Sequence, residues 1–473
     1  MLSIGPRVLA AAAALLLACA ANAAAADWPR FGYDAARSNY APAPTGIDAA
    51  NAGLLQGQRI DLPGAVDSSP LYLGGVDVGG ARHDVFIALS IYGRTFAVDA
   101  NTGAILWSWV PGGIASWEAR EQWVSASPVA DPGRRFVYVG APDGAIHKLS
   151  LADGSEVLAG WPVPVTVLPE REKLSASLNV TGRYVLASTA SFRDHLPYQG
   201  HVVAIDRRTG RRVGVFNVLC ARRRALIDPR RCRRNFGGVW GRGDPVVEPG
   251  SGRLLFSTGN GGLDNRDAFG ESLVELSPDA RRVLRVWSPR SYRVDAKVDA
   301  DLGSGSPVLL RRRYVVQASK DGTVRLLDLR RMRRHGRPGR MPGLLGAVRP
   351  SPRAPYFSAP AGRPSGSTVY LANGAGTVAY SLRGRRPRLV RRWKTRLPGT
   401  TPVLAGGLLY VYDHHAGRVN VLNPANGRVL ASLPGEPGHW TSPIVADGRV
   451  AVGAGDARDH PVAGSLFIYR VAR

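Results

Sequence analysis

The segment LLFSTGNGGLDN, residues 254–265, places a polar side chain where a predicted strand ends. The apolar run followed by Gly-Asn-Gly predicts a strand that enters a turn, because Gly and Asn both tolerate positive φ. Asn260 then has two interpretations. It serves only the turn, as Asn-Gly dipeptides commonly do, or its side chain holds a group at the rim of a sheet.

Other residue patterns exclude several chemistries. No Ser-His-Asp order, P-loop or dinucleotide-binding glycine signature is present in the sequence. The pair His414 and His415 offers two metal ligands, but neighbours on a strand point to opposite faces, so a shared ion is not expected. Hydrolase triads, nucleotide-binding loops and a His-pair metal centre are therefore not predicted.

The N-terminus resembles a cleaved targeting segment. Arg7 precedes a long apolar stretch that ends in small residues, and cleavage after Ala23 or Ala26 fits the small-x-small rule. We predict a signal peptide over residues 1–26 and one mature domain over 27–473, exported to the cell envelope or beyond. A lipoprotein anchored through Cys19 is the alternative, but the residues before it fit that signal poorly.

Two cysteines remain after cleavage, Cys220 and Cys232. In an oxidising compartment they are predicted to pair and to close the basic loop CARRRALIDPRRC. Two free thiols are the alternative. A zinc site is not expected, since no His lies nearby.

The formal net charge of +26 is carried almost entirely by Arg. An exported chain meets little nucleic acid, and no nucleic-acid-binding motif is present, so nucleic acid is not the expected partner. An anionic envelope polymer or a phospholipid surface fits better, and a solvated basic surface is the alternative.

The runs 311–313 and 330–340 are predicted to be exposed loops between repeats. We expect a monomer.

Eight related units fill most of the chain. Each unit begins with a small residue and Pro, continues through alternating apolar strands, and ends near an aromatic residue. The units span residues 67–109, 125–161, 175–216, 243–287, 305–329, 357–393, 400–433 and 441–471.

These units predict an all-β, eight-bladed β-propeller of four-stranded antiparallel blades. One such sheet cannot bury both faces, whereas radial stacking buries both and leaves only short edges. The eighth unit ends before its last strand, and the stretch LLQGQRIDLP, residues 54–63, can supply that strand. The ring would then be closed by an N-terminal strand, which removes an open edge.

The units resemble the pyrroloquinoline quinone (PQQ) repeat. The stretch GRTFAVDANTGAILW, residues 93–107, is close to the repeat pattern, and WPRFGYDAARSNYAP, residues 28–42, looks like the first segment of quinoprotein dehydrogenases. The stretches at residues 298–310 and 318–328 are similar to the polyvinyl-alcohol-dehydrogenase-like branch. The repeat is shared by redox enzymes and by envelope scaffolds, so the fold alone does not settle function.

The resemblance implies PQQ and Ca²⁺ in the central channel. Trp240 matches the indole floor beneath the quinone, and Asn260 matches a Ca²⁺ ligand. Asp301 matches the carboxylate that takes the alcohol proton beside the ion, with Asp299 as a close neighbour. Lys320 matches the cation beside the quinone oxygens.

Some family features are missing. The loop of the third unit, residues 187–201, holds no Glu to ligate Ca²⁺, and only Asp194 could replace it. No vicinal Cys pair and no haem-attachment motif are present, so electrons would leave to an external acceptor. Two functions therefore remain open: a PQQ-dependent alcohol dehydrogenase, or a non-catalytic propeller that binds envelope partners.

Overall fold

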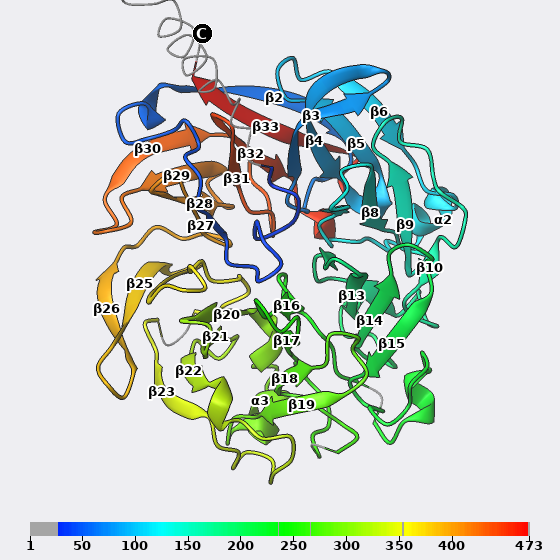
Figure 1. Ribbon diagram of the computed structural model, residues 1–473, viewed down its shortest axis with the longest axis vertical. Coiled ribbons are helices and arrows are strands. Elements are labelled where there is room, and N and C mark those ends of the chain that lie inside the picture. The colour runs from blue at the N-terminus through cyan, green and yellow to red at the C-terminus, as the bar shows by residue number, and fades with distance from the viewer. Residues whose placement is uncertain (1–26, 235, 265, 352–353, 472–473) are drawn as a thin grey trace, which may run out of the picture.

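Eight β-sheets are arranged around a central axis in the computed structural model (Figure 1). The structure describes residues 27–471 except 235, 265 and 352–353. The predicted signal peptide and the Cys19 alternative therefore lie outside the described residues. The eight-bladed all-β propeller predicted from the repeats is confirmed.

The sheets follow the chain in order. The first blade contains β3 (Leu71–Val78), β4 (Ala81–Leu89), β5 (Thr95–Asp99) and β6 (Ile105–Trp109), and the second contains β7 (Val129–Ala130), β8 (Phe136–Gly140), β9 (Ala145–Ser150) and β10 (Val163–Pro164). The third contains β11 (Glu172–Leu174), β12 (Asn179–Val180), β13 (Tyr184–Ser191), β14 (His201–Asp206) and β15 (Arg212–Asn217). The fourth contains β16 (Val246–Val247), β17 (Leu254–Ser257), β18 (Leu273–Leu276) and β19 (Val283–Trp287). The next three contain β20 (Pro307–Leu310), β21 (Tyr314–Ala318), β22 (Val324–Asp328) and β23 (Leu344–Val348); β24 (Thr368–Asn373), β25 (Gly376–Arg383) and β26 (Arg388–Lys394); and β1 (Tyr40–Ala41), β27 (Val403–Ala405), β28 (Leu408–Asp413), β29 (Arg418–Leu422) and β30 (Val429–Pro434). The last contains β31 (Ile444–Ala446), β32 (Arg449–Ala454), β33 (Ala463–Val471) and β2 (Leu55–Pro63).

Short helices connect some of the strands. The α-helices are α2 (Ile114–Ala119) and α3 (Tyr292–Lys297), and the 3₁₀ helices are η1 (Ala52–Leu54), η2 (Ile91–Gly93), η3 (Pro229–Arg231), η4 (Leu302–Ser304), η5 (Leu329–Arg331) and η6 (Ala457–Asp459). No helix among the described residues is long and apolar enough to cross a bilayer.

The N-terminal strand β2 closes the ring. It pairs antiparallel with β33 over nine residues, from Leu55 opposite Val471 to Pro63 opposite Ala463 (Figure 1, blue beside red). Ile60 and Leu62 are buried against the blade while Arg59, Asp61 and Pro63 are exposed, as period-two patterning requires. The predicted closing strand is therefore confirmed.

A second N-terminal segment covers the inner edges of the blades. Trp28 bridges Tyr72 of the first blade, and Tyr40 pairs in parallel with Leu404 of the seventh. Between them, the buried guanidinium of Arg37 donates to the carbonyl oxygens of Ser177 and Leu178, each at 2.8 Å. Inner-strand backbone groups that would otherwise lack partners are satisfied in this way.

The sixth blade departs from the pattern. Its described sheet has three strands, and a single bridge between Ala361 and Tyr370 replaces the first strand. Pro360 and Pro364 flank this bridge, and proline cannot donate to a strand ladder, which explains the shortening.

Two smaller predictions are wrong. The runs 311–313 and 330–340 lie within the fifth blade, after β20 and β22, rather than between blades. Strand β28 ends at Asp413, so His414 and His415 occupy a turn, where their ring centroids lie 4.0 Å apart instead of on opposite faces.

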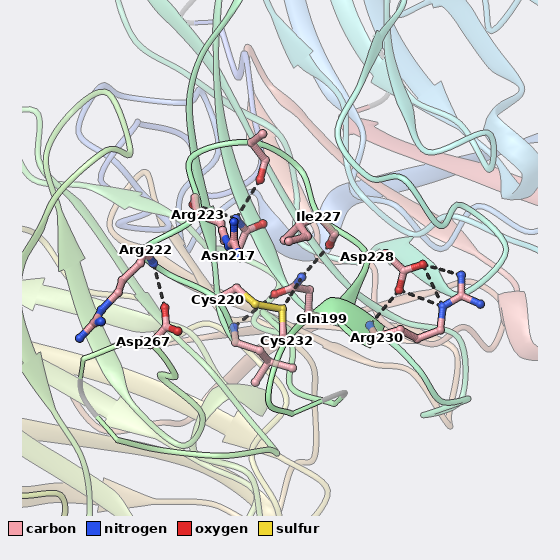
Figure 2. Close-up of a disulfide and its surroundings, with 12 residues drawn as sticks. Gln199, Asn217, Cys220, Arg222, Arg223, Ile227, Asp228, Arg230, Cys232 and Asp267 are labelled. Carbon is pink, nitrogen blue, oxygen red and sulfur yellow. Dashed lines mark hydrogen bonds and ion pairs between the residues drawn. A yellow bond between two sulfur atoms is a disulfide. The ribbon is translucent and has the colours of Figure 1, made fainter.

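Cys220 and Cys232 form a disulfide whose Cα atoms lie 5.7 Å apart (Figure 2). The enclosed loop is also held by side chains of the third blade. Asn217 donates to the carbonyl oxygens of Arg223 and Ala225, each at 3.0 Å, and Gln199 donates to that of Ile227 at 2.8 Å. The loop is therefore fixed to the third blade, and its basic side chains are exposed.

Replacing both cysteines by serine should lower the free energy of unfolding by about 2–3 kcal/mol, because a loop of this length gains that much conformational freedom in the unfolded chain. Urea unfolding of the mature protein measures the effect. Dithiothreitol should shift the parent to the midpoint of the double variant and leave the variant unchanged. Equal midpoints for parent and variant without reductant would contradict the prediction.

Candidate functional site

Blade connectivity brings two sets of loops to one end of the propeller. The first two strands of each blade are antiparallel, so the start of the first and the end of the second lie at the same end. Asp194, Asn260 and Lys320 follow the second strands β13, β17 and β21. Trp240 and Asp301 precede the first strands β16 and β20. Residues far apart in sequence thus share one rim.

A cavity of about 200 Å³ opens at this rim. Four of the five residues predicted to form a site line it: Asp194, Trp240, Asp301 and Lys320. The other lining residues are Ser125, Lys173, Ser175, Arg242, Asp299, Ser304, Phe357 and Trp440. Blades two to six and the eighth blade all contribute, so the cavity lies on the channel rather than beside one blade.

Asn260 is a turn residue and a site residue at once. Its backbone has a φ of 61°, in the left-handed region that Asn tolerates. Its side-chain amide donates to Asp194 at 3.3 Å and to the Tyr198 hydroxyl at 3.2 Å. It is not among the residues that line the cavity, but it holds Asp194, which is. Both interpretations of the Asn-Gly turn are therefore compatible with the structure.

The backbone amide of Asn260 joins two buried carboxyl groups. It donates to Glu271 Oε1 at 2.6 Å and to Asp301 Oδ1 at 3.0 Å, and the two side chains are hydrogen-bonded to each other. Glu271 also accepts from the amide of Leu302 at 2.8 Å and is fully buried. Two like charges this close disfavour double ionisation, so the pair is expected to share a proton.

Burial raises the pKa of Asp301 to about 6, and the neighbouring Asp299 and Asp194 carboxylates act in the same direction. The Lys320 ammonium opposes this rise. Burial also raises the pKa of Glu271 well above its usual range, and the charge of Asp301 adds to that effect. Of the pair, Asp301 is therefore the group that ionises near neutral pH, which suits a general base.

Lys320 is paired at the rim of the cavity. Its ammonium lies 2.5 Å from the Asp299 carboxylate, which is more than half exposed. Its backbone amide donates to the carbonyl oxygen of Asp301 at 3.1 Å. The cation thus sits beside the predicted base while its charge is partly balanced by the outer carboxylate.

Two further cations face the cavity. Arg242 is buried and donates to the carbonyl oxygen of Asp67 at 2.9 Å. Lys173 lies over the ring of Trp123 at 4.4 Å, and burial lowers the pKa of its ammonium to about 8. Together with Lys320 they create a site that favours an anionic ligand.

Three polar atoms of the cavity wall lack partners among the described residues: Ser175 Oγ, Trp240 Nε1 and Arg242 Nε. Buried polar groups are normally hydrogen-bonded, so three such atoms at one cavity indicate a place for a polar ligand. Aromatic rings flank the same space. Trp440 packs edge-on against Phe357 with centroids 5.1 Å apart, and Trp240 packs edge-on against Tyr198.

A second cluster lies where the first and eighth blades meet. Asp67, His439 and Asp456 place one ligand atom each within 4.8 Å of one another. The imidazole Nδ1 lies 3.1 Å from both carboxylates, and Arg458 pairs with Asp456 at 2.7 Å. Arg458 balances Asp456, and the imidazole of His439 bridges the two carboxylates, so these contacts account for the cluster among the described residues.

Sequence reasoning missed Glu271, Lys173, Arg242 and Trp440. Glu271 carried a weak signal, as an acidic residue at the head of an apolar strand, ESLVEL. Lys173 carried another, because lysine is rare in this chain. Nothing in the pattern distinguished Arg242 or Trp440 from the many other arginines and the other tryptophans.

The blades and the rim cavity together define an eight-bladed propeller of the PQQ-repeat class. The PQQ_2 family model, described as outer membrane protein assembly factor BamB, matches residues 64–335. This is more than half of the chain, so the chain belongs to that family. No curated protein sequence is significantly similar to the chain.

Solved structures share the fold at low identity. Quinohemoprotein alcohol dehydrogenase from Comamonas testosteroni aligns with a TM-score of 0.67 at 16% identity, covering 99% of this chain and 85% of that one. A europium-containing methanol dehydrogenase aligns with a TM-score of 0.68 at 15% identity, covering 94% and 98%. BamB from Moraxella catarrhalis aligns with a TM-score of 0.53 at 14% identity, covering 87% and 97%. At these identities the comparisons establish the fold, and the site has to be argued from its own residues.

Proposed function

We propose that the protein is an exported quinoprotein that oxidises a small alcohol with PQQ and Ca²⁺ bound at the rim cavity and passes the electrons to an external acceptor. One observation carries the proposal. Residues from six blades converge on a cavity that combines stacking rings, unsatisfied donors, cations and a carboxyl group whose pKa lies near neutrality. Relatives of the fold named as quinohemoprotein and methanol dehydrogenases support it.

The residues suit a flat anionic quinone. Trp240 and Trp440 offer planar rings for stacking, while Lys173, Arg242 and Lys320 complement carboxylate groups on the ligand. Asp194 and Asp301, which line the cavity, would supply oxygen ligands for Ca²⁺ in the absence of a Glu from the third blade, and Asn260, predicted as a ligand, would hold Asp194 through its amide.

PQQ, when bound, supplies the chemistry that accepts a hydride from the alcohol carbon. The chain's own contribution is proton transfer and orientation. Asp301, ionised above its pKa of about 6, takes the hydroxyl proton at a carboxylate oxygen. The amide of Asn260 fixes that carboxylate by hydrogen bonding to Oδ1. Lys320 holds positive charge at the edge of the same space and stabilises developing negative charge.

Saturable quenching of tryptophan fluorescence by PQQ, in the presence of Ca²⁺, is the expected result for the mature protein. Trp240→Ala should weaken PQQ binding about 10–100-fold, since loss of an aromatic stacking partner costs about 1–3 kcal/mol. Trp117→Ala serves as the matched control, because Trp117 lies on α2 outside the cavity.

Dye reduction with a series of short alcohols tests catalysis in the same samples. Binding without turnover would overturn the enzymatic part of the proposal and leave a PQQ-binding propeller. The absence of saturable quenching at micromolar PQQ would overturn the proposal as a whole.

One observation favours a second function, a non-catalytic binding propeller. Several site residues already have polar partners within the protein. Glu271 is hydrogen-bonded to Asp301, Lys320 forms an ion pair with Asp299, and Asn260 donates a hydrogen bond to Asp194. A propeller that had lost its cofactor would retain such a network. The quenching experiment separates the two functions, because only the first requires PQQ to bind.

A further inference from the structure

The positive charge of the chain is concentrated in one segment. Residues 329–412 contain sixteen Arg and one Lys but no Asp or Glu, so all 36 acidic residues of the chain lie elsewhere. A general preference for arginine codons raises Arg everywhere, but it does not remove acidic residues from one stretch. The segment therefore needs an explanation of its own.

Most arginines of this segment lie on or beside the outer strands of the fifth and sixth blades, β23 and β26. The segment runs from η5 through β23 and β26, and β23 lies against β26 (Figure 1, yellow to gold). We name this surface the arginine rim and define it by the exposed arginines that line its cavities and have no ion-pair partner among the described residues, namely Arg290, which follows β19, and Arg331, Arg340, Arg385, Arg386, Arg388, Arg391, Arg392 and Arg396.

The arginine rim is hollowed rather than flat. A cavity of about 1050 Å³ lies between the end of β19 and β23, with Arg290, Arg331 and Arg340 in its walls. A second cavity of about 580 Å³ shares Arg331 with the first and adds Arg385, Arg386 and Arg388. A third of about 720 Å³ follows along β26, lined by further Arg residues and Lys394.

The few carboxylates near the rim are already engaged. Asp321 pairs with Arg325 at 2.5 Å, and Asp328 pairs with Arg313 at 2.5 Å. The guanidinium groups of the arginine rim are exposed to solvent, and their N–H donors have no carboxylate partner among the described residues. Guanidinium groups match phosphate and carboxylate oxygens in bidentate geometry, which a lysine ammonium does not provide.

We propose that the arginine rim binds a linear anionic polymer, a chain that carries phosphate or carboxylate groups along its length. Three cationic hollows in series suit a ligand that repeats its charge, whereas one small anion would occupy only one of them. A bilayer presents a flat charged plane and would contact the rims of these hollows but not their walls. The inference is independent of PQQ binding, since the rim lies outside the cavity lined by Trp240 and Asp301.

Fluorescence anisotropy with labelled inorganic polyphosphate, and separately with labelled poly-L-glutamate, tests the proposal on the mature protein. Binding of at least one probe should saturate at low salt and weaken steeply as salt rises. The variant R385Q/R386Q/R388Q should lose about tenfold or more in affinity, because three contacts to the chain are removed.

The matched control is R222Q/R223Q/R224Q, which removes the same charge from the exposed disulfide loop. It should change the affinity less than twofold. Equal losses in the two variants would mean that net charge alone attracts the polymer and would overturn the assignment to the rim.

Two further measurements complete the test. Sedimentation with phosphatidylglycerol vesicles distinguishes a membrane: vesicle binding without binding of either polymer would overturn the proposal. Thermal unfolding of both variants should match the parent, so that a lost affinity reports the surface and not the fold.

Discussion

Asp301→Asn should unfold at a higher temperature than the parent protein at pH 8 while losing PQQ-dependent dye reduction. The side chain is 4% exposed and faces Glu271, so the parent holds a charge there at a cost in stability. Asn keeps the shape, still accepts from the amide of Asn260, and offers its own amide to Glu271. The neutral side chain removes the desolvation cost that burial imposes on the ionised carboxylate.

The pH dependence of this effect follows from the raised pKa. Below about pH 3 the carboxyl is protonated in both the folded and unfolded chains, so it costs nothing. As pH rises towards the folded pKa of about 6, the unfolded chain ionises more readily, and the parent loses stability relative to the variant. The difference should be absent at about pH 3 and reach about 2–3 kcal/mol at pH 7 and above.

Differential scanning calorimetry across pH 3 to 8 measures the difference. Asp299→Asn is the matched control, because it makes the same change at an exposed carboxylate, where removal of an ion pair costs about 0–1 kcal/mol. Parallel stability curves for the parent and Asp301→Asn would show that the buried pair does not shift ionisation. If the Asp301→Asn variant still reduced the dye, Asp301 would not be the general base.

The architecture was predictable because each blade carries its own local signals. Alternating apolar residues and glycine turns repeat eight times, and the shortage of one strand at the C-terminus required a donor from the N-terminus. The missing first strand of the sixth blade was not predicted. The two prolines around Ala361 remove backbone N–H donors, and their effect depends on which strand would have paired with them.

The candidate site was predictable only in part. Resemblance indicated Trp240, Asn260, Asp301 and Lys320, and blade geometry brings them together at one rim. Glu271 was missed because its role depends on Asp301, thirty residues later in the sequence. The backbone amides of Asn260 and Leu302 hold the Glu271 carboxyl group beside that residue. Arg242 was missed because arginine is too common in this chain to mark a site. Contacts between blades are set by radial stacking, which a periodic pattern does not encode.

The largest effect on stability is expected at the strand that closes the ring. Leu62 of β2 is 2% exposed and packs into the core shared by the first, seventh and eighth blades. Leu62→Asp would place a charge in that core, which should cost more than about 4 kcal/mol. The cost falls on the strand pairing that closes the eighth blade, so β2 should detach as a unit and expose the edge of β33.

Hydrogen exchange followed by mass spectrometry locates the change. Protection should fall most across residues 463–471 and 55–63, and much less in β21 of the opposite side, where every residue stays buried. Gln56→Asp is the matched control, because it adds the same charge at an exposed position of the same strand. A uniform loss of protection in all blades would mean that the ring unfolds as one cooperative unit, in which case closure by β2 sets global rather than local stability.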